Sequence, residues 1–134
     1  ELAKHWGGGP ISVSVIAKRQ AIPPRFLELI LGQLRQGGFV ESRRGVHGGY
    51  LLAVDPARLY VGQIIRVIDG PVAPVSCVVA NRESNCPLRG NGAFMSRWCV
   101  ARDAVAVVYD QTSFQDLIEK EAAAVETYVA SYCI

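Results

Sequence analysis

The chain has 134 residues, of which half are apolar and 19% are charged, so it can form one domain with a buried core. No apolar run approaches the ~18 residues of a membrane span, the first residues lack the apolar core of a secretory signal, and four cysteines are too few for a disulfide scaffold. We therefore expect a cytoplasmic protein, away from membranes, whose thiols are free or bound to metal. The net charge is +2, but residues 1–50 carry seven basic and three acidic side chains, so an anionic partner is expected to meet this part.

Two helices are expected in the first twenty residues. A short helical fragment at residues 1–6 ends at the glycine-rich run 7–10. Ser12 can cap a second helix that runs to about Gln20, because its hydroxyl can accept a hydrogen bond from a free N–H group of the first turn. A tight turn at residues 21–23 then leads to the next helix.

The segment 24–36 has the clearest helical pattern in the chain. Pro24 suits the first helical position, where its missing N–H costs nothing, and Gly37 and Gly38 end the helix. Apolar residues recur at helical spacing and are expected to face the core: Phe26, Leu27, Ile30, Leu31 and Leu34. The opposite face is formed by Arg25, Glu28, Gly32 and Arg35.

A β-hairpin is expected after this helix. Residues 39–43 and 50–54 are the predicted strands, and the turn 45–49 between them contains three glycines. Residues 61–69 are expected to form a further helix. This order of helices and hairpin predicts a winged helix-turn-helix domain over residues 1–70, in a mainly α fold with a small β-hairpin wing.

The second half of the chain predicts a loop and then long helices. Residues 71–92 contain prolines, glycines and two cysteines without a helical or alternating pattern, which is typical of a loop. A long helix is predicted over 93–110 from the spacing of four side chains: Phe94, Trp98, Val105 and Tyr109. Thr112 and Gln115 match a capping box for a last helix through Lys120, which the alanine-rich end of the chain extends.

A winged helix-turn-helix recognises DNA through its geometry. The second helix of the pair enters the major groove, where its exposed side chains meet the base edges. Arg25 can donate to guanine or phosphate, and Glu28 can accept from the amino group of cytosine. The wing is expected to bring Arg43 and Arg44 beside the duplex, where the negative potential of a narrow minor groove favours arginine.

Three runs of residues carry a family resemblance: 22–31, 34–45 and 48–52. They are similar to the bacterial transcriptional regulators that include IscR, NsrR and CymR. The most specific motif is the wing, Ser-x-Arg-Gly-x-x-Gly-Gly-Tyr-x-Leu, which begins at Ser42. The resemblance continues through 61–65 and 69–70, weakens, and returns at 109–117, so that it covers most of the chain.

The resemblance implies a homodimer that binds a palindromic operator in double-stranded DNA, with the helix at 93–110 joining the subunits within a C-terminal unit of residues 93–134. It also implies that the first helix lacks its beginning here. The apolar face of the 93–110 helix alone is equally compatible with packing inside a monomer. The candidate DNA-contacting residues are Ser12, Pro24, Arg25, Glu28, Arg35, Arg43, Arg44, Gly45, His47, Gly48, Gly49 and Tyr50.

Members of this family that hold an iron–sulfur cluster carry three closely spaced cysteines before the dimerisation helix. Here the gaps between Cys77, Cys86 and Cys99 are wider, at nine and thirteen residues. A loop could still bring the three thiolates to a 2Fe–2S cluster or a zinc ion. Alternatively, Cys77 and Cys86 form an oxidation-sensitive pair, or the cysteines only pack as small apolar residues.

The sequence therefore predicts a sequence-specific DNA-binding transcriptional regulator that acts as a homodimer, with residues 71–92 as a sensory loop for redox state or iron–sulfur status. One alternative is a cluster-free regulator of the same family that responds to a thiol switch or a small metabolite. The other is a winged-helix module that binds proteins without DNA contact. An enzyme is not expected, since the chain has no Cys-x-x-Cys motif, phosphate-binding loop or cluster of carboxylates.

Overall fold

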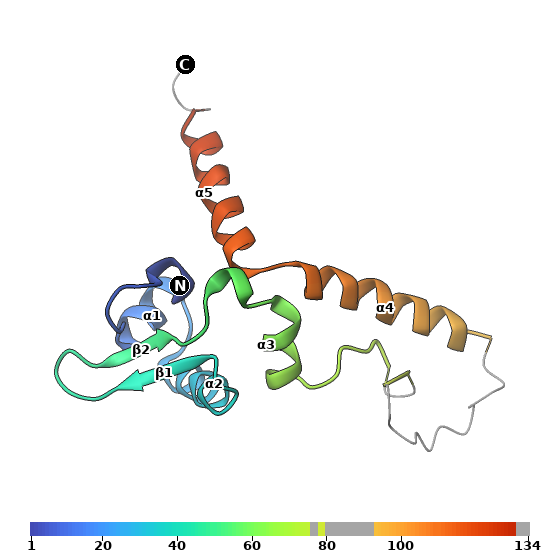
Figure 1. Cartoon of the computed structure of the whole chain (residues 1–134), viewed down its shortest axis with the longest axis horizontal. Coiled ribbons are helices and arrows are strands. Elements are labelled where there is room, and N and C mark those ends of the chain that lie inside the picture. Colours follow the sequence, from blue (N-terminus) through green and yellow to red (C-terminus); the bar gives the residue numbers. More distant parts are fainter. Residues whose placement is uncertain (76–77, 80–92, 131–134) are drawn as a thin grey trace.

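The computed structural model describes residues 1–75, 78–79 and 93–130. Its elements, in chain order, are η1 (Ala3–His5), α1 (Val13–Gln20), α2 (Pro24–Gln36), β1 (Val40–Arg43), β2 (Gly49–Leu52), η2 (Pro56–Arg58), α3 (Val61–Ile68), α4 (Met95–Gln111) and α5 (Phe114–Ala130). Figure 1 shows α1, α2, the hairpin and α3 gathered at one end, with α4 and α5 projecting in different directions. The predicted fold class, mainly α with a two-stranded antiparallel wing, is confirmed among these residues.

Local sequence sets the ends of α1 and the start of α2. The Ser12 hydroxyl accepts a hydrogen bond from the Val15 N–H at 3.4 Å, as its predicted capping role requires. Helix α1 ends where Ala21 takes the left-handed conformation, with φ of 52°. Pro24 occupies the first position of α2, in agreement with the sequence pattern. The short turn between α1 and α2 leaves the two helices in contact with each other.

Strand alternation sorts the wing into an inner and an outer face. Val40 pairs with Leu52, and Ser42 pairs with Tyr50 in the antiparallel ladder. Val40 and Leu52 are 3% and 9% exposed and belong to the core. Alternation along the strands puts exposed Ser42 and half-buried Tyr50 on the same face of the hairpin as this pair, which is the inner face. Strand β1 begins one residue later than predicted, because Phe39 lies outside the ladder, and β2 begins one residue earlier and ends two residues earlier than predicted.

The segment before α1 pairs with the wing. The Ile11 N–H donates to the Tyr50 carbonyl and the Tyr50 N–H donates to the Ile11 carbonyl, both at 2.8 Å. A Cβ atom on Gly49 would lie 2.2 Å from the Ile11 carbonyl oxygen, and one on Gly48 would lie 2.3 Å from that of Arg43. Both positions therefore require glycine, which explains the glycine pair of the wing motif in terms of backbone approach.

The core consists of two clusters of buried side chains. The first lies between α1 and α2 and contains Ile11, Ile16, Ala17, Leu27 and Leu31. The second joins η1, the hairpin and the segment before α3, and contains Ala3, Val40, Leu52 and Leu59. Leu2 and Tyr50 pack against both clusters, so the beginning of the described chain and the wing are part of the same core.

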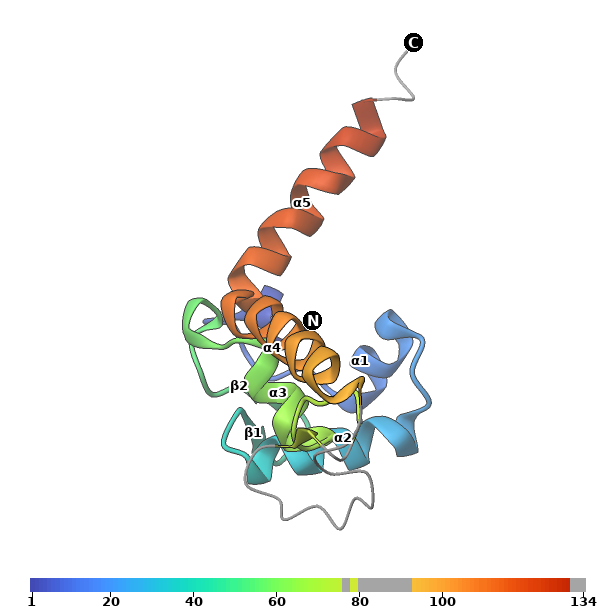
Figure 2. The ribbon, with the colours of Figure 1, turned by 90° about the vertical axis from the view of Figure 1, so that its right-hand side faces the viewer.

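Helix α4 leaves this core and contacts it mainly through α3. Figure 2, turned by 90°, shows α4 crossing α3 while α5 runs away from both. None of the α4 side chains is buried. A bridge between Tyr60 and Ser113 ties the segment before α3 to the junction of α4 and α5, which fixes where α4 departs.

The predicted capping box at Thr112 and Gln115 is wrong by one residue. The Asp116 N–H donates to the Ser113 hydroxyl at 3.1 Å, and the Ser113 N–H donates to the Asp116 carboxylate at 2.9 Å. The Thr112 hydroxyl instead donates to the Val108 carbonyl at 2.7 Å, at the end of α4. The reciprocal pair uses an aspartate where the sequence pattern favours glutamate or glutamine, which is why the pattern pointed to the neighbouring residues.

Two other expectations at the sequence level are corrected. The helical fragment at residues 1–6 is a single 3-10 turn at η1, because its hydrogen bonds join residues three apart. Phe26, expected to face the core, is 56% exposed. Phe26 lies at the edge of the apolar face of α2, next to Ile30, which is itself only half-buried.

Candidate nucleic-acid interface

Helix α2 buries one side and leaves the other open to a partner. Leu27 and Leu31 are 5% and 3% exposed and pack against α1. Arg25 and Glu28 are exposed on the opposite side, as the helical spacing predicts. Leu29, which the sequence analysis assigned to neither face, is 69% exposed and lies on this outer side. The outer face of α2 therefore carries a cation, a carboxylate and an apolar side chain within two turns.

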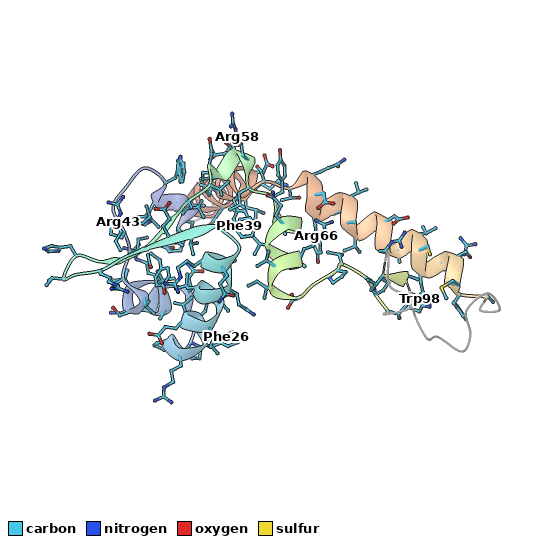
Figure 3. The ribbon with its side chains drawn as sticks, turned by 60° about the horizontal axis from the view of Figure 1, so that its bottom comes forward. Phe26, Phe39, Arg43, Arg58, Arg66 and Trp98 are labelled. Atoms are coloured by element: carbon cyan, nitrogen blue, oxygen red, sulfur yellow. The ribbon has the colours of Figure 1, made fainter. Side chains whose placement is uncertain are left out.

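A hydrogen bond connects α2 to the wing. The Arg35 Nη1 donates to the Ser42 Oγ at 3.3 Å. Glu28 lies seven residues before Arg35, two turns away on the same side of the helix, so this side of α2 borders β1. Alternation along β1 places Arg43 with Glu41 on the other face of the hairpin. Arg43 is thus separated from the α2 side of the wing, as its place in Figure 3 illustrates.

The tip of the wing is fully open. Arg44, Gly45 and His47 are exposed, and Val46 is 98% exposed. Among the described residues, neither Arg44 nor His47 has an ion pair or side-chain hydrogen bond. Both side chains are therefore available to a partner.

Ion pairing inside the protein reduces the number of available cations. Lys4 pairs with Glu121, and Arg19 pairs with Glu1 at 2.6 Å. The Arg19 guanidinium donates to the Glu1 carboxylate and thereby lowers the pKa of Glu1. Five cations of the first fifty residues remain without an ion pair in the described part of the chain: Lys18, Arg25, Arg35, Arg43 and Arg44. Only Glu28 and Glu41 oppose them on these elements, so α1, α2 and the wing carry a local excess of positive charge.

The predicted contact residues fall into two groups. Those exposed on α2 or the wing are Pro24, Arg25, Glu28, Arg35, Arg43, Arg44, Gly45 and His47. The other four are half-buried and have structural roles in the fold: Ser12, Gly48, Gly49 and Tyr50. Ser12 caps α1, the glycines allow the wing to close, and half-buried Tyr50 packs on both core clusters.

Leu29 and Phe26 are the exposed apolar residues of α2 that sequence reasoning missed. Leu29 follows Arg25 by four residues and precedes Gly32 by three, and both were assigned to the outer face. This spacing alone could have placed Leu29 between them. Phe26 was missed because an aromatic side chain beside an apolar stripe is usually part of the core.

The cysteine prediction falls mostly outside the described residues, since Cys77 and Cys86 are not among them. Cys99 lies in the second turn of α4, is half-buried and has no disulfide partner among the described residues. Within residues 1–75, 78–79 and 93–130, no three His, Cys, Asp or Glu side chains converge in a way that could hold a metal ion. The described residues alone therefore do not form a cluster site.

Helix α4 presents an apolar row to the outside. Val100, Val107 and Val108 are 61%, 51% and 61% exposed, and Ala104 lies between them. These residues are spaced four, seven and eight apart, so they share one side of the helix. In the described part of the chain, no helix is both long enough and apolar enough to cross a membrane.

The chain matches known transcriptional regulators over most of its length. The family model Rrf2, described as an iron-dependent transcriptional regulator, matches residues 1–120. The regulator CymR of Bacillus subtilis is 36% identical over 129 residues, which cover 96% of this chain and 87% of CymR. Several other curated relatives match over a shorter stretch, and for IscR of Xenorhabdus nematophila the chain spans 47% of the relative's length.

Solved structures agree with this relationship. CymR of B. subtilis, described as the global cysteine regulator, superposes with a TM-score of 0.68 at 36% identity, covering 89% of this chain and 84% of CymR. IscR of T. potens superposes with a TM-score of 0.72 at 31% identity, covering 92% and 79%. CymR of Staphylococcus aureus in its oxidised form gives 0.65 at 34% identity, covering 87% and 82%. The fold of this chain therefore matches the winged-helix structures of CymR and IscR, and these relatives are transcriptional regulators rather than enzymes.

Proposed function

Because the chain belongs to the Rrf2 family of transcriptional regulators, we propose that it binds operator sequences in double-stranded DNA through α2 and the wing. The observation that carries this proposal is the set of five cations on α1, α2 and the wing that have no ion pair with any described residue and are opposed by two carboxylates. Arg25 on α2 suits the major groove, and Arg44 at the wing tip suits the minor groove beside it. The phosphates supply most of the affinity, and the base edges supply the specificity.

We also propose that the regulator is a homodimer joined through α4. The outward row Val100, Ala104, Val107 and Val108 has the spacing of a helix–helix seam, and within the described residues nothing packs against it. A second copy of α4 would bury this row and place two reading helices about a two-fold axis. Such a dimer binds a palindromic operator, because two-fold symmetry in the protein matches two-fold symmetry in the DNA.

The test of DNA binding starts with duplexes selected by the purified protein from a random pool. Wild type is expected to enrich a palindromic sequence, and the variant Arg25→Ala/Arg44→Ala is expected to lose affinity for it. Arg58→Ala is the matched control, since Arg58 is exposed, has no ion pair among the described residues and lies on the opposite side of the molecule from Phe26 in Figure 3. Failure to enrich any sequence would favour the protein-interaction module instead.

The test of the dimer is sedimentation of Val107→Glu, which places a charge in the proposed seam. This variant is expected to sediment as a monomer and to bind the selected duplex weakly. Val46→Glu introduces the same charge at the 98% exposed wing tip and should leave the dimer intact. A wild-type protein that is monomeric at micromolar concentration would contradict the proposal.

We further propose that Cys77, Cys86 and Cys99 sense redox state. The support is the iron-dependent description of the family and the solved oxidised form of S. aureus CymR. A 2Fe–2S cluster would require ligands beyond the described residues, so the decisive measurement is the visible absorption spectrum of protein purified without oxygen, with iron and sulfide assayed together. Matching iron and sulfide would identify a cluster sensor, and a colourless protein whose DNA affinity changes with oxidant would identify a thiol switch. A colourless protein that ignores oxidant would contradict the redox proposal.

A further inference from the structure

We propose that Leu29 and Phe26 recognise thymine methyl groups in the major groove, an inference that rests on the proposed DNA binding. Leu29 is 69% exposed and Phe26 is 56% exposed, and both lie in the first two turns of α2. They are three residues apart, so their side chains are neighbours on the helix surface. The structure therefore offers a continuous apolar surface at the end of the helix whose residues are expected to meet the bases.

The fold does not account for this surface. The α1–α2 core is made by Leu27 and Leu31 on the other side of the helix, with Ile30 and Leu34 half-buried beside them. A single exposed leucine needs no explanation, but a leucine beside a phenylalanine on one helix end is a patch that a partner can cover. Figure 3 shows Phe26 at the end of α2 farthest from α4, away from the apolar row proposed to form the dimer.

The charges around the patch identify its partner as DNA rather than an apolar protein surface. Arg25 precedes Phe26, Glu28 precedes Leu29, and the excess of cations on α1, α2 and the wing favours a polyanion. The C5-methyl of thymine is the apolar group that the base edges present in the major groove. Arginine can bind guanine and glutamate can bind cytosine, so the four side chains together can discriminate three kinds of base.

The experiment replaces thymine by uracil in the selected operator, which removes only the methyl group. Wild type is expected to lose about fourfold in affinity for each contacted methyl, the effect of one buried carbon. Leu29→Ala and Phe26→Ala should each lose affinity for the thymine operator and become insensitive to uracil at one position. Leu117→Ala on α5, a leucine that is 41% exposed, is the matched control and should keep the wild-type sensitivity at every position.

Three other outcomes overturn the inference and leave the proposed function intact. A wild type that binds the thymine and uracil operators equally makes no methyl contact. An alanine variant as sensitive to uracil as wild type places the contact elsewhere on the protein. Selected operators without thymine in either half-site contradict it directly. Loss of all sequence-specific binding would instead refute the function on which the inference rests.

Discussion

Arg66 on α3 and Asp110 on α4 form a two-pronged ion pair, with Nη1 to Oδ1 at 2.6 Å and Nη2 to Oδ2 at 2.8 Å. The pair joins α3, which contacts α2, to the projecting helix α4. Figure 3 labels Arg66 on α3. The Arg66 guanidinium donates to the Asp110 carboxylate and lowers the pKa of Asp110. Both side chains are more than one third exposed, so solvent screens their attraction.

The first prediction concerns acid. Because the folded pKa of Asp110 is below its unfolded value, the stabilisation by the pair is complete above the unfolded pKa and is lost as the pH falls through the folded pKa. Asp110→Asn should lower the free energy of unfolding by less than about 1 kcal/mol at pH 7. Urea unfolding should show this difference shrinking below about pH 4. In an Arg66→Gln background, the effect of Asp110→Asn on the free energy of unfolding should not change with pH. If it still changes, Arg66 does not cause the lowered pKa of Asp110.

The second prediction compares two helical glycines. A Cβ atom on Gly32 would meet nothing within 4 Å, so Gly32→Ala should stabilise the protein by about 1 kcal/mol through helix propensity alone. A Cβ atom on Gly62 would lie 2.0 Å from the Asp110 Oδ1 and would push the carboxylate away from Arg66. Gly62→Ala should therefore gain less than Gly32→Ala in urea unfolding. Equal gains would mean that the ion pair adjusts without loss.

The third prediction concerns the wing. A Cβ atom on Gly49 would collide with the backbone carbonyl of Ile11, which cannot move without breaking the pairing of Ile11 with Tyr50. Gly49→Ala should cost about 2 kcal/mol in the free energy of unfolding, the scale of backbone strain. Gly9→Ala, where a Cβ atom has nothing within 4 Å, should cost almost nothing. Thermal unfolding of the two variants side by side decides the point, and similar melting temperatures would contradict the prediction.

The fourth prediction concerns the salt dependence of DNA binding. If Arg44 enters the minor groove, Arg44→Ala should weaken binding and make the slope of log K against log salt shallower by about one, since one fewer counterion is released. The affinity for labelled operator DNA can be measured by fluorescence anisotropy at salt concentrations from about 50 to about 200 mM. Arg58→Ala should change neither affinity nor slope. An unchanged slope in Arg44→Ala removes Arg44 from the interface.

Strong local patterns in the sequence were sufficient to predict most of the fold. Helix α2 has a proline at its first residue, apolar residues at helical spacing and glycines at its end, and its observed bounds match the prediction. The start of α5 was displaced by one residue, because Thr112 and Ser113 can both act as caps and only their surroundings decide between them. The outward apolar row of α4 was missed because the helix is apolar on several sides, so periodicity favoured Trp98 and Tyr109 instead.

The candidate site was predictable where helical spacing alone decides whether a side chain is exposed, and less predictable on the wing, where strand register also decides it. Arg25 and Glu28 were placed by helical spacing and are exposed. Arg43 and Arg44 were treated as equivalent, but alternation along β1 turns Arg43 to the far face of the hairpin, which only the register reveals. The DNA contact predicted for Tyr50 stays a prediction. The structure shows half-buried Tyr50 packing on both core clusters, on the face of the hairpin that it shares with its strand partner Ser42.

The pairing of Ile11 with Tyr50 has a consequence for the DNA itself. Hydrogen bonds join the wing to Ile11, just before α1, and to Arg35 of α2. The hairpin and α2 are therefore held in one orientation relative to each other. If α2 faces the major groove and the wing tip faces the minor groove, as we propose, the distance between these two points is a fixed property of the subunit. A duplex whose grooves do not match that distance has to bend to fit, and easily bent sequences would be favoured at positions that no side chain touches.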